Sequence, residues 1–135
     1  MRQTADSSVT IAAILTDDED HDLAEAALER CSTTIAHVAI ETYSVLTRLP
    51  PSLRLEGADA ATIIDARLPS SRVTLNADTY AEVPERLARA GVAGGSTYDG
   101  LIALTALEHE LELLSRDRRA ARAYRVLGVR FRLLA

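Results

Sequence analysis

Short segments with the composition of β-strands alternate with segments of helical periodicity along the whole of this 135-residue chain. A helix between two strands returns the chain to the same end of the sheet, so the strands run parallel. We therefore expect an α/β fold, a three-layer α/β/α sandwich with a central, mainly parallel sheet. At this length the chain forms one domain, residues 1–135. The expected strands are 2–5, 32–36, 72–75, 111–114 and 129–134, and the expected helices are 8–15, 23–31, 37–49, 58–68, 79–90, 97–110 and 116–126.

The absence of lysine excludes several kinds of chemistry, because all 15 cationic side chains are arginines. A Walker-A phosphate loop, a Schiff-base enzyme and a receiver-type phosphoacceptor site each require a lysine. The single cysteine, Cys31, forms no internal disulfide and no cysteine-built zinc site, and it fits a reducing cytoplasm. No run of about 18 apolar residues predicts a membrane span, and the polar first residues do not resemble a signal peptide.

The charge is distributed unevenly. The chain carries −5 overall, but residues 116–135 contain seven arginines and one aspartate, a formal charge of +6. A local basic patch on an acidic protein attracts a phosphate backbone, which makes Arg116, Arg118 and Arg119 candidate RNA contacts. A solvated last helix and strand explains the same residues equally well.

Four acidic residues are expected beyond the carboxyl ends of the strands, where open α/β sheets bind their ligands. Asp6 follows the first strand, Glu41 lies early in helix 37–49, Asp99 lies in the first turn of helix 97–110, and Asp117 follows strand 111–114. Three of these residues have a ready structural explanation, since Asp6 and Asp117 are suited to cap helices and Asp99 fits a capping box with Ser96. Glu41 is harder to explain in this way, because it borders the apolar stripe of its helix, whereas a surface glutamate would face the other way.

The set of four favours a metal site. Four carboxylates at one edge of a sheet repel one another, and some would have to take up protons to stay there. Mg²⁺ or Mn²⁺ removes that conflict, since both ions prefer oxygen ligands and Mg²⁺ keeps several waters. Such a site suits phosphodiester hydrolysis, because the metal lowers the pKa of a bound water and offsets charge on the phosphate.

The segments "ADSSVTIAAI", "IETYSVL", "GGSTYDGLIALTAL" and "LLSRDRRAARAYRVLGV" together resemble a PIN-domain ribonuclease. The resemblance is strongest to bacterial VapC-type toxins of toxin–antitoxin pairs, and it covers essentially the whole chain. It implies that the four acids hold Mg²⁺ or Mn²⁺ for endonucleolytic cleavage of RNA, with Ser8 and Ser115 as supporting hydroxyls. The matched acids, in chain order, are Asp6, Glu41, Asp99 and Asp117. Gly100 departs from the more usual alanine and is expected to loosen the start of its helix.

The resemblance further implies a growth-inhibiting toxin that forms a homodimer and is silenced by a cognate antitoxin. Such an inhibitor would place a cation among the acids or lay an apolar helix into a groove formed by the first helices. Two alternatives remain open from the sequence, a catalytically silent PIN-fold binding module and a metal-dependent DNA nuclease. His21, His37 and His109 lack zinc-site spacing and are given no catalytic role, and the few aromatic residues predict no base-stacking platform.

Overall fold

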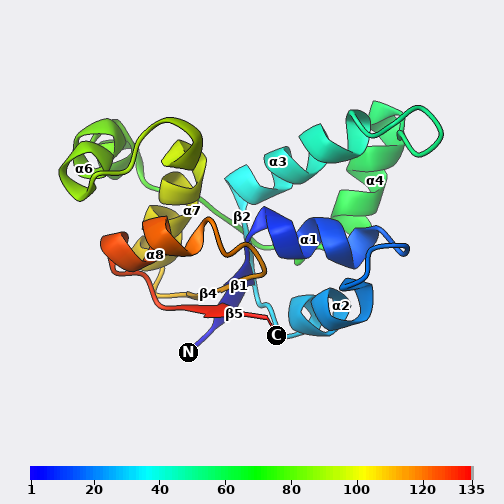
Figure 1. The fold of residues 1–135 in the computed structure, drawn as a ribbon, viewed down its shortest axis with the longest axis horizontal. Helices are drawn as coiled ribbons and strands as arrows, with labels where there is room; N and C mark the ends of the chain where they lie inside the picture. The colour runs from blue at the N-terminus through cyan, green and yellow to red at the C-terminus, as the bar shows by residue number, and fades with distance from the viewer. Residues whose placement is uncertain (135) are drawn as a thin grey trace.

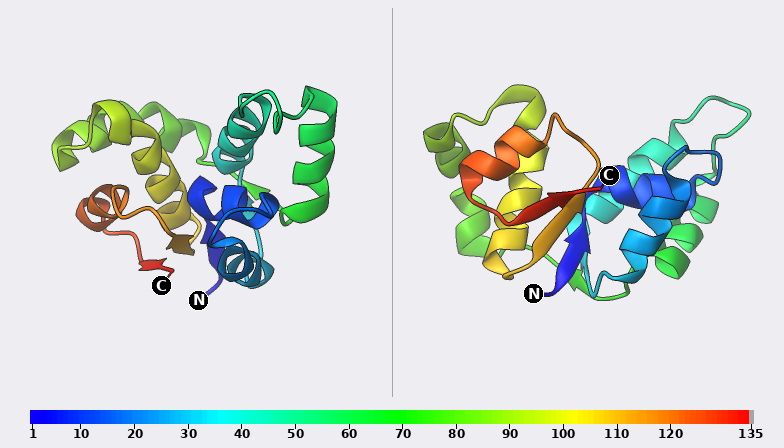
Figure 2. Two further views of the ribbon diagram at one scale, coloured as in Figure 1. Left: turned by 45° about the vertical axis from the view of Figure 1, so that its right-hand side comes forward. Right: turned by 60° about the horizontal axis from the view of Figure 1, so that its bottom comes forward.

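The computed structural model describes residues 1–134 and confirms the α/β class, with every paired strand parallel to its neighbour. In the right-hand view of Figure 2, β1, β4 and β5 lie side by side between two groups of helices. Gln3 is in register with Glu112, and Leu113 is in register with Phe131. The strands are β1 (Gln3–Ala5), β2 (Thr34–Ile35), β3 (Arg72–Val73), β4 (Glu112–Ser115) and β5 (Phe131–Leu133).

Helices follow the strands as the alternation predicted, and they cover both faces of the sheet (Figure 1). The longest helices are α3, which directly follows β2 and carries Glu41, and α7, which follows a glycine-containing turn and carries Asp99. The helices are α1 (Ser7–Ile14), α2 (His21–Glu29), α3 (Ala36–Thr47), α4 (Gly57–Arg67), α5 (Ala77–Ala81), α6 (Val83–Ala90), α7 (Thr97–Glu108) and α8 (Ala121–Leu127), with a 3₁₀ turn, η1 (Gly94–Ser96), before α7.

The sheet differs from the expected single ladder. Backbone pairing within residues 1–134 gives a three-stranded sheet of order β1-β4-β5 and a separate pair, β2-β3. The two pieces meet where the Ser32 amide donates to the Gln3 carbonyl at 3.1 Å and the Thr4 hydroxyl donates to the Thr33 carbonyl at 2.9 Å. β2 is only two residues long and forms a regular ladder with β3 alone, so it does not extend the sheet of β1.

Two helix boundaries also differ from the sequence prediction. The expected helix 79–90 is two helices, α5 and α6, which meet at Glu82, and Pro84 lies in the first turn of α6, where a missing N–H is tolerated. The last helix begins at Ala121 rather than at residue 116, because the side chain of Asp117 accepts hydrogen bonds in the turn ahead of it.

The core lies on both sides of β1 and β4. Leu114 packs on one side with Val9 and Leu46, while Leu113 packs on the other side with Ile102 and Tyr124. Each such fully buried side chain contributes roughly 1.5–3 kcal/mol. The buried hydroxyls of Thr10 and Thr42 hydrogen-bond at 2.7 Å. This bond joins α1 to α3 and thereby helps to position Glu41, which precedes Thr42 on α3.

None of the helices in the described part of the chain has the length and apolar character that a membrane crossing requires.

Candidate active site

The four candidate acids come from the cap of α1, the second turn of α3, the first turn of α7 and the segment after β4, and these parts of the chain lie beyond the C-terminal ends of β1 and β4. Figure 1 shows the first turns of α1 and α3 close together near the centre of the molecule. Asp6 follows β1 directly and Asp117 lies two residues after β4, so the parallel pairing of these strands sets the two carboxylates at the same edge.

Asp6 is almost completely buried, with 3% of its surface exposed, and both of its carboxylate oxygens are hydrogen-bonded. Oδ1 accepts from the backbone amides of Ser8 at 3.0 Å and Val9 at 3.4 Å and from the Ser8 hydroxyl at 2.5 Å. Oδ2 accepts from the Tyr124 hydroxyl at 2.7 Å. Burial raises the pKa of Asp6, and the hydroxyls of Ser115, Ser8 and Tyr124 act in the opposite direction.

The two serines implied by the family resemblance lie against these acids. Ser8 bonds to Asp6 and its hydroxyl accepts from the Arg116 amide at 3.0 Å. The fully buried Ser115 hydroxyl accepts from the Asp117 amide at 3.0 Å. Asp117 in turn caps the following turn by accepting from the amides of Arg119 and Ala120. Capping therefore explains the placement of Asp6 and Asp117, but it occupies only Oδ1 of each carboxylate.

Glu41 lies one turn into α3, and its side chain is 29% exposed. Its Oε1 atom is buried and has no hydrogen-bond partner among residues 1–134. Burial raises the pKa of Glu41, the Ser7 hydroxyl lowers it, and the charge of Asp6 raises it again. A buried carboxylate oxygen with no donor is costly, so this atom is suited to a cation.

The pKa of Asp99 is affected by the charges of all three other candidate acids. Burial and the negative charges of Asp117, Asp6 and Glu41, in that order, raise its pKa to about 6. Asp99 is therefore within electrostatic reach of the other three carboxylates, although the four come from separate parts of the chain. Their mutual repulsion is the cost that a bound divalent cation would offset.

The four carboxylates do not converge on a single point in the described chain. No three Asp, Glu, His or Cys side chains within residues 1–134 stand close enough together, as positioned, to enclose an ion. An all-oxygen donor set with an unpartnered Glu41 oxygen and a raised Asp99 pKa still fits Mg²⁺ or Mn²⁺. Mg²⁺ commonly binds through one or two carboxylates and fills its remaining positions with water, which suits carboxylates that are set apart.

The start of α7 departs from one expectation. Ser96 occupies the cap position, but its side chain makes no capping hydrogen bond, so the predicted capping box with Asp99 is not formed. Gly100 lies in the first turn of α7 and is buried. A Cβ at this position would lie 2.5 Å from Leu87 Cδ2 and 3.3 Å from Val92 Cγ1, so the glycine allows α6 to pack closely beside Asp99.

His37 and Tyr98 lie next to Glu41 and Asp99, respectively, although the sequence predicts no catalytic role for His37 and no base-stacking platform. The His37 ring stacks on Tyr98, with ring centroids 5.0 Å apart and planes 17° apart. His37 Nε2 lies 3.7 Å from Glu41 Oε2, is buried, and has no hydrogen-bond partner in the described chain. Burial lowers the pKa of His37. The spacing of His37 and Glu41, i and i+4 on one helix, was the available sequence signal for this neighbourhood.

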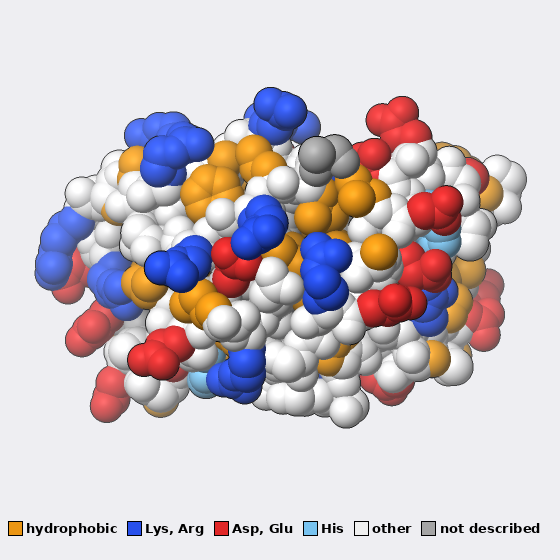
Figure 3. Space-filling model, turned by 90° about the horizontal axis from the view of Figure 1, so that it is seen from below, with side chains coloured by type: hydrophobic (Ala, Val, Ile, Leu, Met, Phe, Trp, Pro, Cys, Tyr) orange, Lys and Arg blue, Asp and Glu red, His pale blue; other side chains and the backbone are white. Residues whose placement is uncertain are grey.

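The three arginines predicted to contact RNA differ in their partners. Arg116 is held by Asp18 at 2.9 Å, by Asp20 at 3.2 Å and by the Ser8 carbonyl at 2.7 Å, so its guanidinium already has partners. Arg118 and Arg119 are exposed. Figure 3 shows basic side chains spread over the part of the molecule that holds α8 and β5, whereas acidic side chains gather toward α2.

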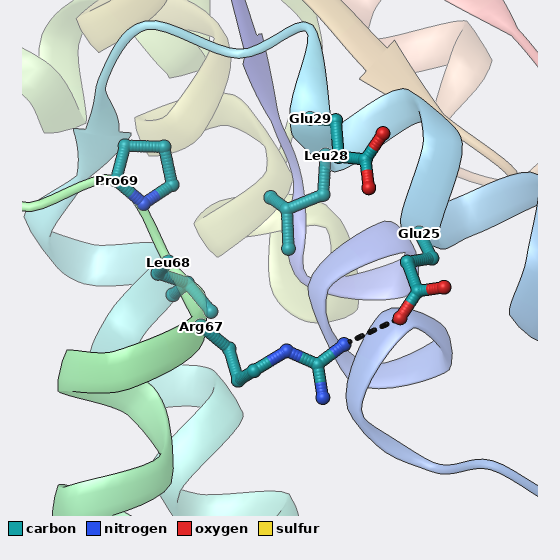
Figure 4. A pocket seen from close by; sticks show the side chains of 6 residues that line it. All are labelled: Glu25, Leu28, Glu29, Arg67, Leu68 and Pro69. Carbon is teal, nitrogen blue, oxygen red and sulfur yellow. Dashed lines mark hydrogen bonds and ion pairs between the residues drawn. The ribbon is translucent and has the colours of Figure 1, made fainter.

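A separate hollow of about 260 Å³ lies between α2 and the end of α4, lined by Leu28, Glu29, Leu68 and Pro69 (Figure 4). Arg67 reaches across it to Glu25 at 2.9 Å. None of the four candidate acids lines this hollow, so it is distinct from the acidic site.

Comparison with known proteins shows the family. The model of the PIN domain matches residues 4–126. Ribonuclease VapC40 of Mycobacterium tuberculosis is 40% identical over 129 residues, which cover 96% of each chain. Ribonuclease VapC27 of the same species is 45% identical over 93 residues, covering 69% of this chain and 67% of its own. The crystal structure of VapBC2 from Rickettsia felis, bound to a DNA fragment from its promoter, shares the fold with a TM-score of 0.68 at 16% identity, over the whole of both chains. The chain therefore belongs to the PIN-domain family.

Proposed function

We propose that this chain is a divalent-metal-dependent endoribonuclease that acts as the toxin of a type II toxin–antitoxin pair. One feature carries the proposal: burial, and then the charges of Asp117, Asp6 and Glu41, raise the pKa of Asp99 to about 6. The names of the relatives, both ribonucleases of the VapC type, support RNA as the substrate. The whole chain, residues 1–135, is proposed to act as one PIN-like unit.

The proposed roles follow from how each acid is held. A bound Mg²⁺ or Mn²⁺ supplies an activated water and offsets negative charge on the phosphate. Asp6 is the most rigid of the acids because both oxygens accept hydrogen bonds, so it fixes the position of the site. Glu41 offers an unpartnered oxygen to the cation. Asp99 and Asp117 complete the negative pocket, and one of these carboxylates orients the attacking water and accepts its proton.

The proposed RNA contacts are Arg118 and Arg119, which are exposed and follow Asp117 directly. Arg116 instead positions the site, because its guanidinium joins the α1–α2 loop to Ser8. Cationic side chains so close to the acids would hold the phosphates on either side of the cleaved bond.

Two protein partners belong to the proposal. A cognate antitoxin would use the hollow between α2 and α4 together with a cation placed among the acids. A second copy of the chain would cover two large, exposed apolar side chains on α3, Ile40 and Tyr43. The proposed location is the cytoplasm, which the single unpaired Cys31 supports.

The test is cleavage of total bacterial RNA by the wild type and by Asp6→Ala and Asp99→Asn, with Mn²⁺ or with EDTA, and with new 5′ ends mapped by sequencing. We expect cuts by the wild type with Mn²⁺ only, and loss of at least about 100-fold in each variant, as for removal of a principal electrostatic group. Equal cleavage by all three proteins would contradict the assigned site. Cleavage of single-stranded DNA in preference to RNA would identify a DNA nuclease, and Mn²⁺-independent binding without cleavage would identify a silent binding module.

A further inference from the structure

We propose that the stacked pair His37–Tyr98 is a nucleobase-binding shelf, which holds one base of single-stranded RNA next to the phosphodiester bond that is cut. The inference rests on the proposed ribonuclease function and deepens it, since it assigns a substrate contact to two residues outside the acidic group. It starts from the stack itself, with centroids 5.0 Å apart and planes 17° apart.

Each ring of the shelf lies on the same helix as one candidate acid, His37 with Glu41 on α3 and Tyr98 with Asp99 on α7. His37 is one helical turn before Glu41, and its Nε2 lies 3.7 Å from Glu41 Oε2. Tyr98 immediately precedes Asp99 in the first turn of α7. An RNA strand whose phosphate lies among the carboxylates therefore has a neighbouring nucleotide over the two rings.

Tyr98 has the exposure that stacking requires. It is 57% exposed although one face of its ring lies on His37, so the remaining surface is open to solvent. The side chain of His37 is only 24% exposed and serves as the inner layer of the stack. A base placed on Tyr98 would be the third ring, and stacking on an aromatic side chain accepts any base because every base has a π-face.

The polar edge of His37 supports the same reading. Its Nε2 atom is buried without a hydrogen-bond partner among residues 1–134, beside a carboxylate oxygen, Glu41 Oε1, that also has none. Both atoms are buried although the side chains that carry them are 24% and 29% exposed, and buried polar atoms are normally hydrogen-bonded. They are explained if a substrate and its cation complete this corner of the site.

A second exposed tyrosine provides a matched control. Tyr80 is 53% exposed, lies on α5 and lines an apolar hollow of about 150 Å³ that also includes His37 and Ile40. It has the same chemistry and exposure as Tyr98 but does not take part in the stack with His37. Replacing either tyrosine by alanine removes a similar exposed aromatic surface, so the two variants differ mainly in where that surface lies.

The experiment uses a fluorescein-labelled RNA oligonucleotide that spans a cut mapped in total RNA, and versions with one abasic nucleotide at each position beside the cut. Binding to the full chain is measured by anisotropy with Ca²⁺ in place of Mn²⁺, and cleavage is measured with Mn²⁺. We expect Tyr98→Ala to weaken RNA binding about 5- to 100-fold, Tyr98→Phe and Tyr98→Trp to retain it, and Tyr80→Ala to leave it unchanged. Mn²⁺ affinity and melting temperature should be the same in Tyr98→Ala as in the wild type.

The abasic series locates the shelf. One abasic position should weaken binding by the wild type and have no effect on Tyr98→Ala, because base and ring are then removed from the same contact. Equal sensitivity of both proteins to every abasic position, or equal losses in Tyr98→Ala and Tyr80→Ala, would overturn the shelf while leaving the ribonuclease intact. A wild type that neither binds nor cuts any RNA would instead overturn the proposed function, and the shelf with it.

Discussion

The hydroxyl of Tyr124 donates a 2.7 Å hydrogen bond to Oδ2 of Asp6 across 118 residues of sequence, and both side chains are buried. Tyr124 comes from α8, the last helix, whereas Asp6 follows the first strand. The contact therefore joins the two ends of the chain at the acidic site. Because a donor to the charged form favours the carboxylate, Tyr124 opposes the effect of burial on Asp6.

Tyr124→Phe removes this donor and keeps the ring. We expect Mn²⁺ affinity and cleavage to fall by about 10- to 100-fold, the usual effect of losing a partner that orients a metal ligand. Titration calorimetry with Mn²⁺ measures the affinity. Phe131→Leu is the control, because Phe131 packs edge-on against the Tyr124 ring, 5.6 Å between centroids, and cannot hydrogen-bond to its hydroxyl. An unchanged Mn²⁺ affinity in Tyr124→Phe would show that Asp6 needs no such support.

The raised pKa of Asp99 makes the metal-free protein sensitive to pH. The carboxyl has a pKa of about 6 in the folded chain and 3.8 as an unperturbed group, so folding binds protons between these values. Stability from Asp99 is therefore highest below about pH 4 and is lost as the pH rises through about 6. Each pKa unit corresponds to about 1.4 kcal/mol before solvent screening, so we expect a loss on the order of 1–2 kcal/mol.

Asp99→Asn isolates this effect from other titrating groups. Urea unfolding in EDTA at pH 4, 5, 6 and 7 should show the wild type losing free energy of unfolding relative to Asp99→Asn as the pH rises. Mn²⁺ at pH 7 should stabilise the wild type more than the variant. A difference between the two proteins that stays constant from pH 4 to 7 would contradict the shared acidic environment.

Gly100→Ala tests the close packing beside Asp99. The added Cβ meets Leu87 Cδ2 at 2.5 Å, and overpacking of this kind costs about 1–3 kcal/mol. Alanine recovers about 1 kcal/mol of helix propensity, so we expect a small net loss in the free energy of unfolding. In a Leu87→Ala background the obstructing methyl is gone, and Gly100→Ala should become neutral or stabilising. A stabilising Gly100→Ala in the wild-type background would mean that Leu87 moves freely.

The arginines of the segment after β4 separate into two groups that salt dependence distinguishes. We expect Arg118→Ala and Arg119→Ala each to reduce the slope of log affinity for RNA against log salt by about 0.7, the value for one phosphate contact on a single strand. Arg116→Ala should leave that slope unchanged and lower stability, because Arg116 is bound to Asp18 and Asp20. A reduced slope for Arg116→Ala would show that it leaves these partners to bind RNA.

Local patterns in the sequence determined the α/β class, the order of the elements and the positions of Asp6 and Asp117 after their strands. These features depend on periodicity and on turn chemistry within a few residues, so they can be predicted without the rest of the chain. The position of Asp99 in the first turn of α7 was predicted in the same way.

Only the tertiary structure decided which side chains meet. The separation of β2-β3 from the larger sheet, the capture of Arg116 by Asp18, and the hydrogen bond from Tyr124 to Asp6 all join segments that are far apart in sequence. The stack of His37 on Tyr98 depends on how α3 and α7 pack, which sets two rings face to face. Periodicity specifies which face of a helix is buried, but it does not specify the partner, because the partner is chosen by shape and charge across the whole core.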